Sequence, residues 1–137
     1  MLIKAFMVAY KAHKGQKDKA GKAYILHPVC VAMHTKGVKR KTVALLHDVV
    51  EDTETTINDL QQLGFNKEIV EAVQAITKKN GERYADYLKR VKANKIAKDV
   101  KLADLEHNSD LSRLKTITEK DKARKEKYGN AIWFLCN

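Results

Sequence analysis

The sequence is poor in residues that cross-link a chain or interrupt its helices: two cysteines, one proline and six glycines occur among 137 residues. Cys30 and Cys136 lie far apart and outside any C-x-x-C pattern, so neither a disulfide framework nor a thiolate zinc site is indicated. Long apolar runs are also missing, because the apolar segment 1–10 contains Lys4 and is followed by Lys11. We therefore expect a soluble, cytoplasmic protein with no membrane span.

Acidic residues are outnumbered by basic ones: 17 Asp and Glu stand against 27 Lys and Arg, which gives a formal net charge of +10. This excess favours a polyanionic partner, whether a nucleotide, a nucleic acid or an anionic surface. The basic residues are not interleaved with aromatic ones as in a single-strand binder. Charge alone does not choose among these partners, the missing interleaving makes nucleic acid the less favoured one, and the oligomeric state is left open.

Apolar residues recur at helical spacing along most of the chain, as in Ile69, Val70, Val73 and Ile76, whereas alternating strand-like runs are scarce. No repeat or linker divides the sequence, so we predict one compact all-α domain over residues 1–137. Capping, proline and glycine signals divide it further. These signals predict a helix that begins at Pro28 and runs through Met33, a short helix between Thr56 and Gly64, and a helix from Asn66 to Ile76. Further helices are expected at about 41–51, 84–93, 95–114 and 119–135.

The most distinctive segment is 44–52, Ala-Leu-Leu-His-Asp-Val-Val-Glu-Asp, where four ionisable side chains stand among aliphatic ones. On a helix, Glu51 lies one turn beyond His47 and Asp52 one turn beyond Asp48. Spacing alone thus gives one pair, His47 and Glu51, that can bind a metal and a second pair, Asp48 and Asp52, that can serve a water molecule. Imidazole with carboxylate suits a divalent manganese, iron or zinc ion, and a nearby acid can take a proton from water that the ion polarises. The alternative is a helix end with solvated acids, which the helix dipole disfavours.

Further candidate ligands lie on either side of this segment. His27 is expected in a turn at a helix start, and Asp104 lies on one helix face with Lys101 and Asn108, at positions i, i+3 and i+7. That face can bind both metal and phosphate. The other histidines, His13, His34 and His107, are interpreted as surface or structural residues, and Tyr84, Tyr87 and Trp133 as packing residues.

Together these motifs resemble the HD-superfamily hydrolase domain of RelA/SpoT homologues, in the form of a small alarmone hydrolase. The matching segments are Tyr24-Ile25-Leu26-His27-Pro28, His47-Asp48-x-x-Glu51-Asp52, Lys101-Leu102-Ala103-Asp104 with Asn108, and Ala12-His13-x-Gly15-Gln16. The resemblance implies a helical HD-domain fold and hydrolysis of the 3′-pyrophosphate of guanosine tetra- or pentaphosphate to GDP or GTP. It also implies one manganese, or another divalent metal, held by His27, His47, Asp48 and Asp104, with Glu51 and Asp52 activating the attacking water.

The resemblance also implies a set of substrate-binding residues. Lys101 and Asn108 match positions near the nucleotide, and the segment Arg124-x-x-Lys127-Tyr128 is similar to the basic C-terminal helix of the family. Two departures concern the base pocket: Asp18 stands where the family usually has a base-contacting cation, so Lys17 or Lys19 is the expected substitute, and Ser109-Asp110-Leu111 is one residue shorter than the usual pattern. A broader nucleotide phosphohydrolase and a non-catalytic basic module that binds nucleic acid therefore remain alternative functions.

Overall fold

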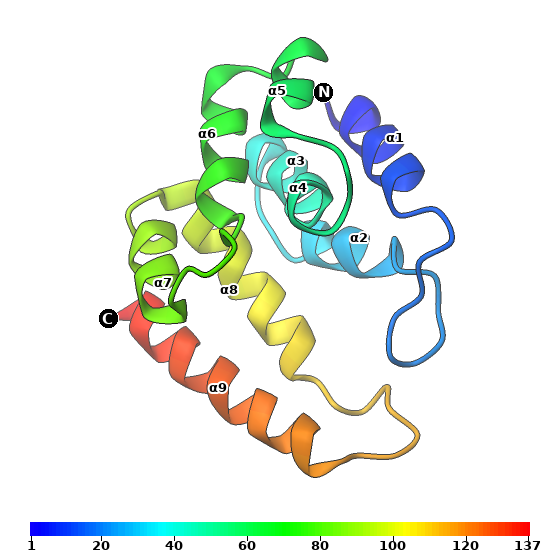
Figure 1. The fold of residues 1–137 in the computed structure, drawn as a ribbon, viewed down its shortest axis with the longest axis vertical. Helices are drawn as coiled ribbons and strands as arrows, with labels where there is room; N and C mark the ends of the chain where they lie inside the picture. The colour runs from blue at the N-terminus through cyan, green and yellow to red at the C-terminus, as the bar shows by residue number, and fades with distance from the viewer.

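A computed structural model describes all 137 residues and contains nine α-helices and no named strand (Figure 1), which confirms the all-α prediction. Helix α3 packs against α1, α2, α6 and α8, and α8 packs against α2, α3, α6, α7 and α9, so these two helices form the centre of the fold. None of the helices has both the length and the apolar character needed to cross a bilayer. The helices are α1 Leu2–Ala12, α2 Leu26–Met33, α3 Val38–Leu46, α4 Val49–Asp52, α5 Ile57–Gln62, α6 Lys67–Ile76, α7 Tyr84–Lys92, α8 Lys95–Ser109 and α9 Glu119–Cys136.

Side-chain caps start several of these helices where the sequence predicts them. Thr56 and Asp59 form a capping box at α5, in which each side chain binds the backbone N–H of the other residue. The Asn66 side chain accepts from the backbone N–H of Ile69 at the start of α6. A second capping box, formed by Thr118 and Asp121, begins α9. Local side-chain caps therefore determine where these three helices begin.

The expected helix over 41–51 is wrong in one respect that matters for function, because it breaks at His47 and Asp48 into α3 and α4. In a continuous α-helix the Ala44 carbonyl would accept from the N–H of Asp48, four residues on. Here the Nδ1 atom of His47 bonds to that carbonyl instead, and the backbone N–H of His47 points to it as well. The imidazole thus competes with the helix for its acceptor and ends α3.

The expected helix over 95–114 is also too long, since α8 ends at Ser109. The Asp110 carboxylate accepts from the backbone N–H of Ser112, a local side-chain turn that replaces further helical bonds.

A third correction concerns Trp133, which is expected to pack in the core but is 68% exposed. Ala131 and Leu135 on the same helix are buried, and Trp133 lies about 200° around the helix from Ala131. Tyr87 is buried and Tyr84 half-buried, as predicted.

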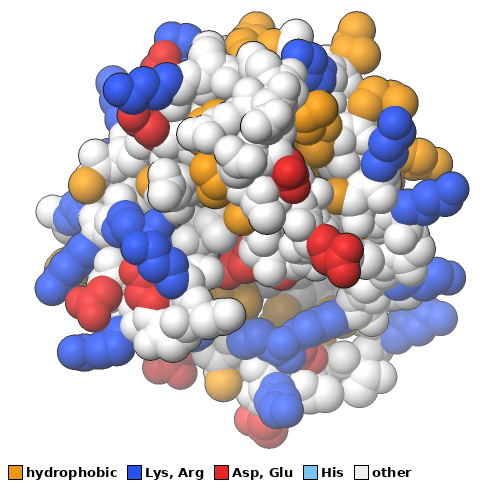
Figure 2. Space-filling model, turned by 45° about the horizontal axis from the view of Figure 1, so that its top comes forward, with side chains coloured by type: hydrophobic (Ala, Val, Ile, Leu, Met, Phe, Trp, Pro, Cys, Tyr) orange, Lys and Arg blue, Asp and Glu red, His pale blue; other side chains and the backbone are white.

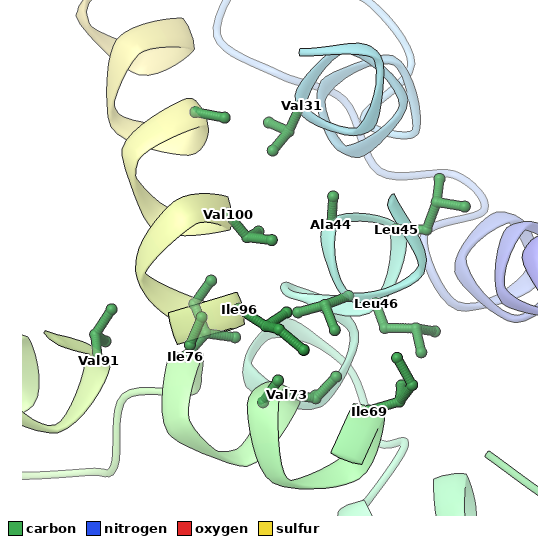
Figure 3. Packing of buried hydrophobic residues seen from close by; sticks show 14 of the residues in the cluster. Val31, Ala44, Leu45, Leu46, Ile69, Val73, Ile76, Val91, Ile96 and Val100 are labelled. Atoms are coloured by element: carbon green, nitrogen blue, oxygen red, sulfur yellow. The ribbon is translucent and has the colours of Figure 1, made fainter. Parts of the chain in front are cut away.

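The core lies where the central helices meet. Figure 3 shows Val31 of α2, Ala44 of α3 and Val100 of α8 directed toward one another, and all three are fully buried. They belong to a cluster of 26 buried apolar residues that also includes Ile69 and Val73 of α6. Packing at native density leaves little freedom for these helices to shift. The core therefore fixes the relative positions of α2, α3 and α8, which carry the polar residues described below.

Arg90 of α7 binds the backbone carbonyls at the C-terminal end of α6. Its guanidinium donates to the carbonyls of Gln74, Ala75 and Thr77 and to the Glu82 carboxylate, at 2.6–2.9 Å. Of these carbonyls, that of Gln74 also accepts from the backbone N–H of Thr77, and hydrogen bonds from a charged donor are among the stronger ones.

We expect Arg90→Ala to lower the free energy of unfolding by about 2–3 kcal/mol, measured by urea denaturation. Arg83→Ala, at an exposed position on the same helix's N-terminal boundary, is the control and should change it by less than about 0.5 kcal/mol. Equal stabilities of the two variants would contradict this role of Arg90.

Candidate metal centre

Three segments distant in the chain bring ionisable side chains to one place. His27 is the second residue of α2, His47 and Asp48 form the junction between α3 and α4, and Asp104 lies in the middle of α8. His27, His47 and Asp104 are buried and Asp48 is half-buried. The junction matters here, because it lets two adjacent residues point the same way.

The distances between these side chains are short enough for a shared ion. His27 Nε2 lies 2.7 Å and His47 Nε2 3.3 Å from Asp104 Oδ1, and one ligand atom from each of these three residues lies within 4.8 Å of the others. Asp48 Oδ2 lies 3.1 Å from His47 Nε2 and 3.7 Å from His27 Nε2. The structure thus brings together the four residues proposed as ligands from the sequence.

The donor chemistry of this cluster fits a divalent metal. Two imidazole nitrogens and two carboxylates suit a borderline divalent ion. The Ala44 carbonyl can only accept a hydrogen bond, so His47 Nδ1 carries a proton and Nε2 is the ring nitrogen directed into the cluster, where it would bind a metal. Neither cysteine is part of the cluster, and the Cys30 Sγ contacts His34 instead.

Two residues of α8 hold the Asp104 carboxylate in place. Lys101 Nζ lies 3.0 Å from Oδ2, and the Asn108 amide donates to Oδ1 at 3.1 Å, which confirms that the three residues share one helix face. Burial would raise the pKa of Asp104, but the Lys101 ammonium and hydrogen bonds from His27 and His47 outweigh it and hold this pKa well below its usual range. Asp104 is therefore a carboxylate at neutral pH, the form a metal ligand requires.

Glu51 and Asp52 lie on α4, directly after the cluster, and both are exposed. Partial desolvation, followed by the negative charge of Asp48, raises the pKa of each. A carboxylate with a raised pKa is a better proton acceptor than an ordinary surface acid. The pairing expected from helical spacing needs correction: His47 clusters with Asp48 rather than with Glu51, because the helix break intervenes.

A cavity of about 280 Å³ opens beside His27 and receives most of the predicted substrate-binding residues. Lys17, Lys19, Asn108, Arg124 and Tyr128 all line it. Figure 2 shows a face of the molecule with acidic side chains recessed in a central hollow and Lys and Arg side chains along its lower rim. Recessed acids below a basic rim are suited to a metal ion and an anionic ligand.

Two predicted substrate-binding residues lie elsewhere. Lys101 is not part of the cavity lining and is engaged with Asp104. The Lys127 ammonium lies 4.1 Å from the centroid of the Tyr84 ring and lines a separate pocket between α7 and α9. A contact of Lys127 with substrate stays a prediction, and this arrangement does not favour it.

The loop before α2 explains the unusual Asp18. Its carboxylate accepts from the backbone N–H groups of Ala20 and Lys22 and lies 3.6 Å from Arg113 in the loop after α8. Asp18 therefore organises its own loop and joins it to the opposite wall of the cavity. Arg113, which the sequence reasoning did not single out, also lines the cavity. Across the cavity, Asp121 pairs with Lys19 and Arg124.

Three more side chains at the site were missed or given no role from sequence. The Tyr24 hydroxyl donates to Asp48 Oδ2 at 2.6 Å, and His107 Nδ1 lies 2.7 Å from His27 Nδ1. His13 is 2% exposed, its Nδ1 contacts the Gln16 side chain, and its Nε2 has no partner. His107 follows Asp104 by three positions, so its helical spacing could have placed it on the same face.

The fold and the cluster define an all-helical domain with a buried His-His-Asp site suited to a divalent metal ion. The chain belongs to the HD domain family, whose pattern matches residues 5–133. It is 37% identical over 123 residues to the bifunctional (p)ppGpp synthase/hydrolase SpoT of Escherichia coli, and 38% identical over 130 residues to a guanosine-3′,5′-bis(diphosphate) 3′-pyrophosphohydrolase of Spiroplasma citri. These similarities confirm the resemblance to RelA/SpoT hydrolase domains.

These matches cover most of this chain but only a small part of each relative. They cover 78% and 83% of this chain but only 17% and 16% of the two relatives. A solved structure of a metazoan orthologue of SpoT, described as hydrolysing ppGpp, superposes with a TM-score of 0.79 at 22% identity. That superposition covers 98% of this chain and 84% of the other, so the HD-domain fold predicted from the motifs is confirmed.

Proposed function

We propose that this protein hydrolyses the 3′-pyrophosphate of guanosine tetraphosphate or pentaphosphate, using a divalent metal. The observation that carries the proposal is the convergence of His27, His47 and Asp104, with Asp48 beside them, next to a cavity with a basic lining. Relatives that share more than a third of their aligned residues with this chain are named as hydrolases of this nucleotide. We propose manganese as the metal, although the donor set also suits other divalent ions.

The metal, when bound, lowers the pKa of water and polarises a phosphoryl oxygen. His27, His47, Asp48 and Asp104 would hold it, with Lys101 and Asn108 keeping Asp104 oriented. Glu51 or Asp52 would accept the proton of the attacking water, for which their raised pKa values fit. The proposed division of labour is that α2, α3 and α8 supply the ligands and α4 supplies the base.

The cavity beside His27 would take the nucleotide. Lys17, Lys19 and Arg124 supply positive charge for its phosphates, and Asn108 and Tyr128 supply polar contacts. In the free protein Asp121 partly neutralises Lys19 and Arg124. A ligand with several phosphate charges would compete with this one carboxylate for the two cations.

The direct test is incubation of the manganese-loaded protein with guanosine tetraphosphate and separation of the products. We expect GDP and pyrophosphate in equal amounts. Release of inorganic phosphate, or no product from metal-loaded protein, would contradict the proposal.

A second candidate is a broader nucleotide phosphohydrolase, which the position of Asp18 favours. This carboxylate is engaged with two backbone N–H groups and Arg113 rather than free to recognise a base. Parallel assays with adenosine and guanosine 3′,5′-bisdiphosphates separate the two functions. Equal kcat/KM values for both substrates would support the broader activity, whereas a preference for guanosine of tenfold or more would support the specific one.

A further inference from the structure

We infer that His107 is a positioning residue that fixes the tautomer of His27 and so directs the His27 Nε2 lone pair into the metal centre. The inference rests on the proposed metal centre but not on the identity of its substrate. It assigns a role to a histidine that lies outside the four ligands and outside the cavity lining.

The contact between the two rings is a hydrogen bond between two ring nitrogens. The Nδ1 atoms of His27 and His107 are 2.7 Å apart, with ring centroids separated by 4.8 Å and planes inclined by 29°. Two imidazole nitrogens at this distance share one proton, so one of them donates and the other accepts. His107 is the only hydrogen-bond partner of His27 Nδ1.

The direction of this bond follows from what His27 must do. Its Nε2 lies 2.7 Å from Asp104 Oδ1, inside the cluster, so Nε2 is the atom that can bind a metal. A neutral imidazole that binds through Nε2 carries its proton on Nδ1. With a metal on Nε2, His27 therefore donates from Nδ1 and His107 Nδ1 accepts, which places the proton of His107 on its own Nε2.

His47 shows the contrast that makes His107 necessary. Its Nδ1 faces the Ala44 carbonyl, which can only accept, so the backbone alone fixes its tautomer. His27 has no such carbonyl, and at 5% exposure it has little access to bulk water. His27 Nε2 also lies at hydrogen-bond distance from Asp104 Oδ1, so without an acceptor on His107 the proton of His27 would favour Nε2 and block the ligand atom. Asp104 and His107 lie on one face of α8, so one helix supplies both a ligand and the orienting group.

The first measurement uses the unaltered protein loaded with diamagnetic zinc and labelled with ¹⁵N in its imidazoles. Long-range ¹H–¹⁵N spectra should show His107 protonated at Nε2 and unprotonated at Nδ1. A His107 protonated at Nδ1, either as the other tautomer or as the imidazolium, would overturn the inference. This readout is independent of hydrolysis and of any variant's ability to fold.

The second measurement compares Mn²⁺ affinities of His107→Asn and His107→Phe by titration with detection of free Mn²⁺ by electron paramagnetic resonance. Asparagine retains an acceptor oxygen close to the position of Nδ1, whereas phenylalanine retains only the ring. We expect the Kd to rise about 10–100-fold in the Phe variant and to stay within about threefold of the unaltered value in the Asn variant.

His34→Phe is the matched control, because His34 is exposed and bonds only to the carbonyl and thiol of Cys30 on its own helix. It should leave the Kd unchanged. If the Phe and Asn variants of His107 bind Mn²⁺ equally well, whether tightly or weakly, the acceptor role is wrong. Failure of the protein to cleave guanosine tetraphosphate would leave these affinities unaffected and would count against the proposed function alone.

Discussion

Asp48→Asn is expected to lose bound metal and to reduce kcat/KM at least about 1000-fold, equivalent to about 4 kcal/mol in the barrier. Asp48 lies against the Nε2 atoms of both imidazoles, and asparagine removes the negative charge from this side of the centre. It also keeps the size of the side chain and an oxygen that can accept from Tyr24. The ion pairs of Asp48 are with His47 and His27, and it has no Lys or Arg partner.

The measurements are metal content by elemental analysis after manganese loading, and turnover of guanosine tetraphosphate. Asp86→Asn, at an exposed acid in the first turn of α7, is the control and should retain both properties. An Asp48→Asn protein that keeps a full equivalent of metal and its turnover would place the centre elsewhere.

Glu51→Gln and Asp52→Asn test the two proposed proton acceptors on α4, because these substitutions should reduce catalysis without reducing metal binding. The residue that accepts the proton should lose about 10²- to 10⁴-fold in kcat on substitution, the range typical of general bases, with metal affinity retained. The amide keeps the shape of the acid but cannot take a proton.

Both variants are assayed for kcat and for Mn²⁺ affinity. Glu54→Gln, an exposed acid shortly beyond α4, serves as the control and should leave both unchanged. Full kcat in both the Glu51 and the Asp52 variant would exclude α4 as the source of the base.

The sequence predicts the cluster of candidate ligands that the fold brings together, for a physical reason. A metal centre needs specific donor atoms, and His27, His47, Asp48 and Asp104 carry them in motifs that few other functions require. Core packing then brings α2, α3 and α8 together, and their apolar faces are visible as periodicity in the sequence. Caps such as Thr56 and Asn66 are equally local and were predicted as the structure has them.

The contacts that the sequence does not predict depend on tertiary placement. Tyr24 meets Asp48 across 24 positions and His107 meets His27 across 80, and no local pattern links such pairs. The helix break after Leu46 was missed for a different reason. The helical spacing of apolar residues continues through the break, while the His47 imidazole bonds to the Ala44 carbonyl in place of a backbone N–H. The prediction that Trp133 packs in the core is wrong for a third reason. Helix α9 buries only one side, and helical spacing alone does not say which side.

The interruption between α3 and α4 allows two adjacent residues to face the same point. Consecutive residues of an unbroken helix project about 100° apart, so neighbours cannot normally reach the same ion. One side chain that captures a carbonyl of the preceding turn removes this restriction. Here, a dipeptide directs an imidazole and a carboxylate to a common point, and the acids of the following turn remain exposed directly after it.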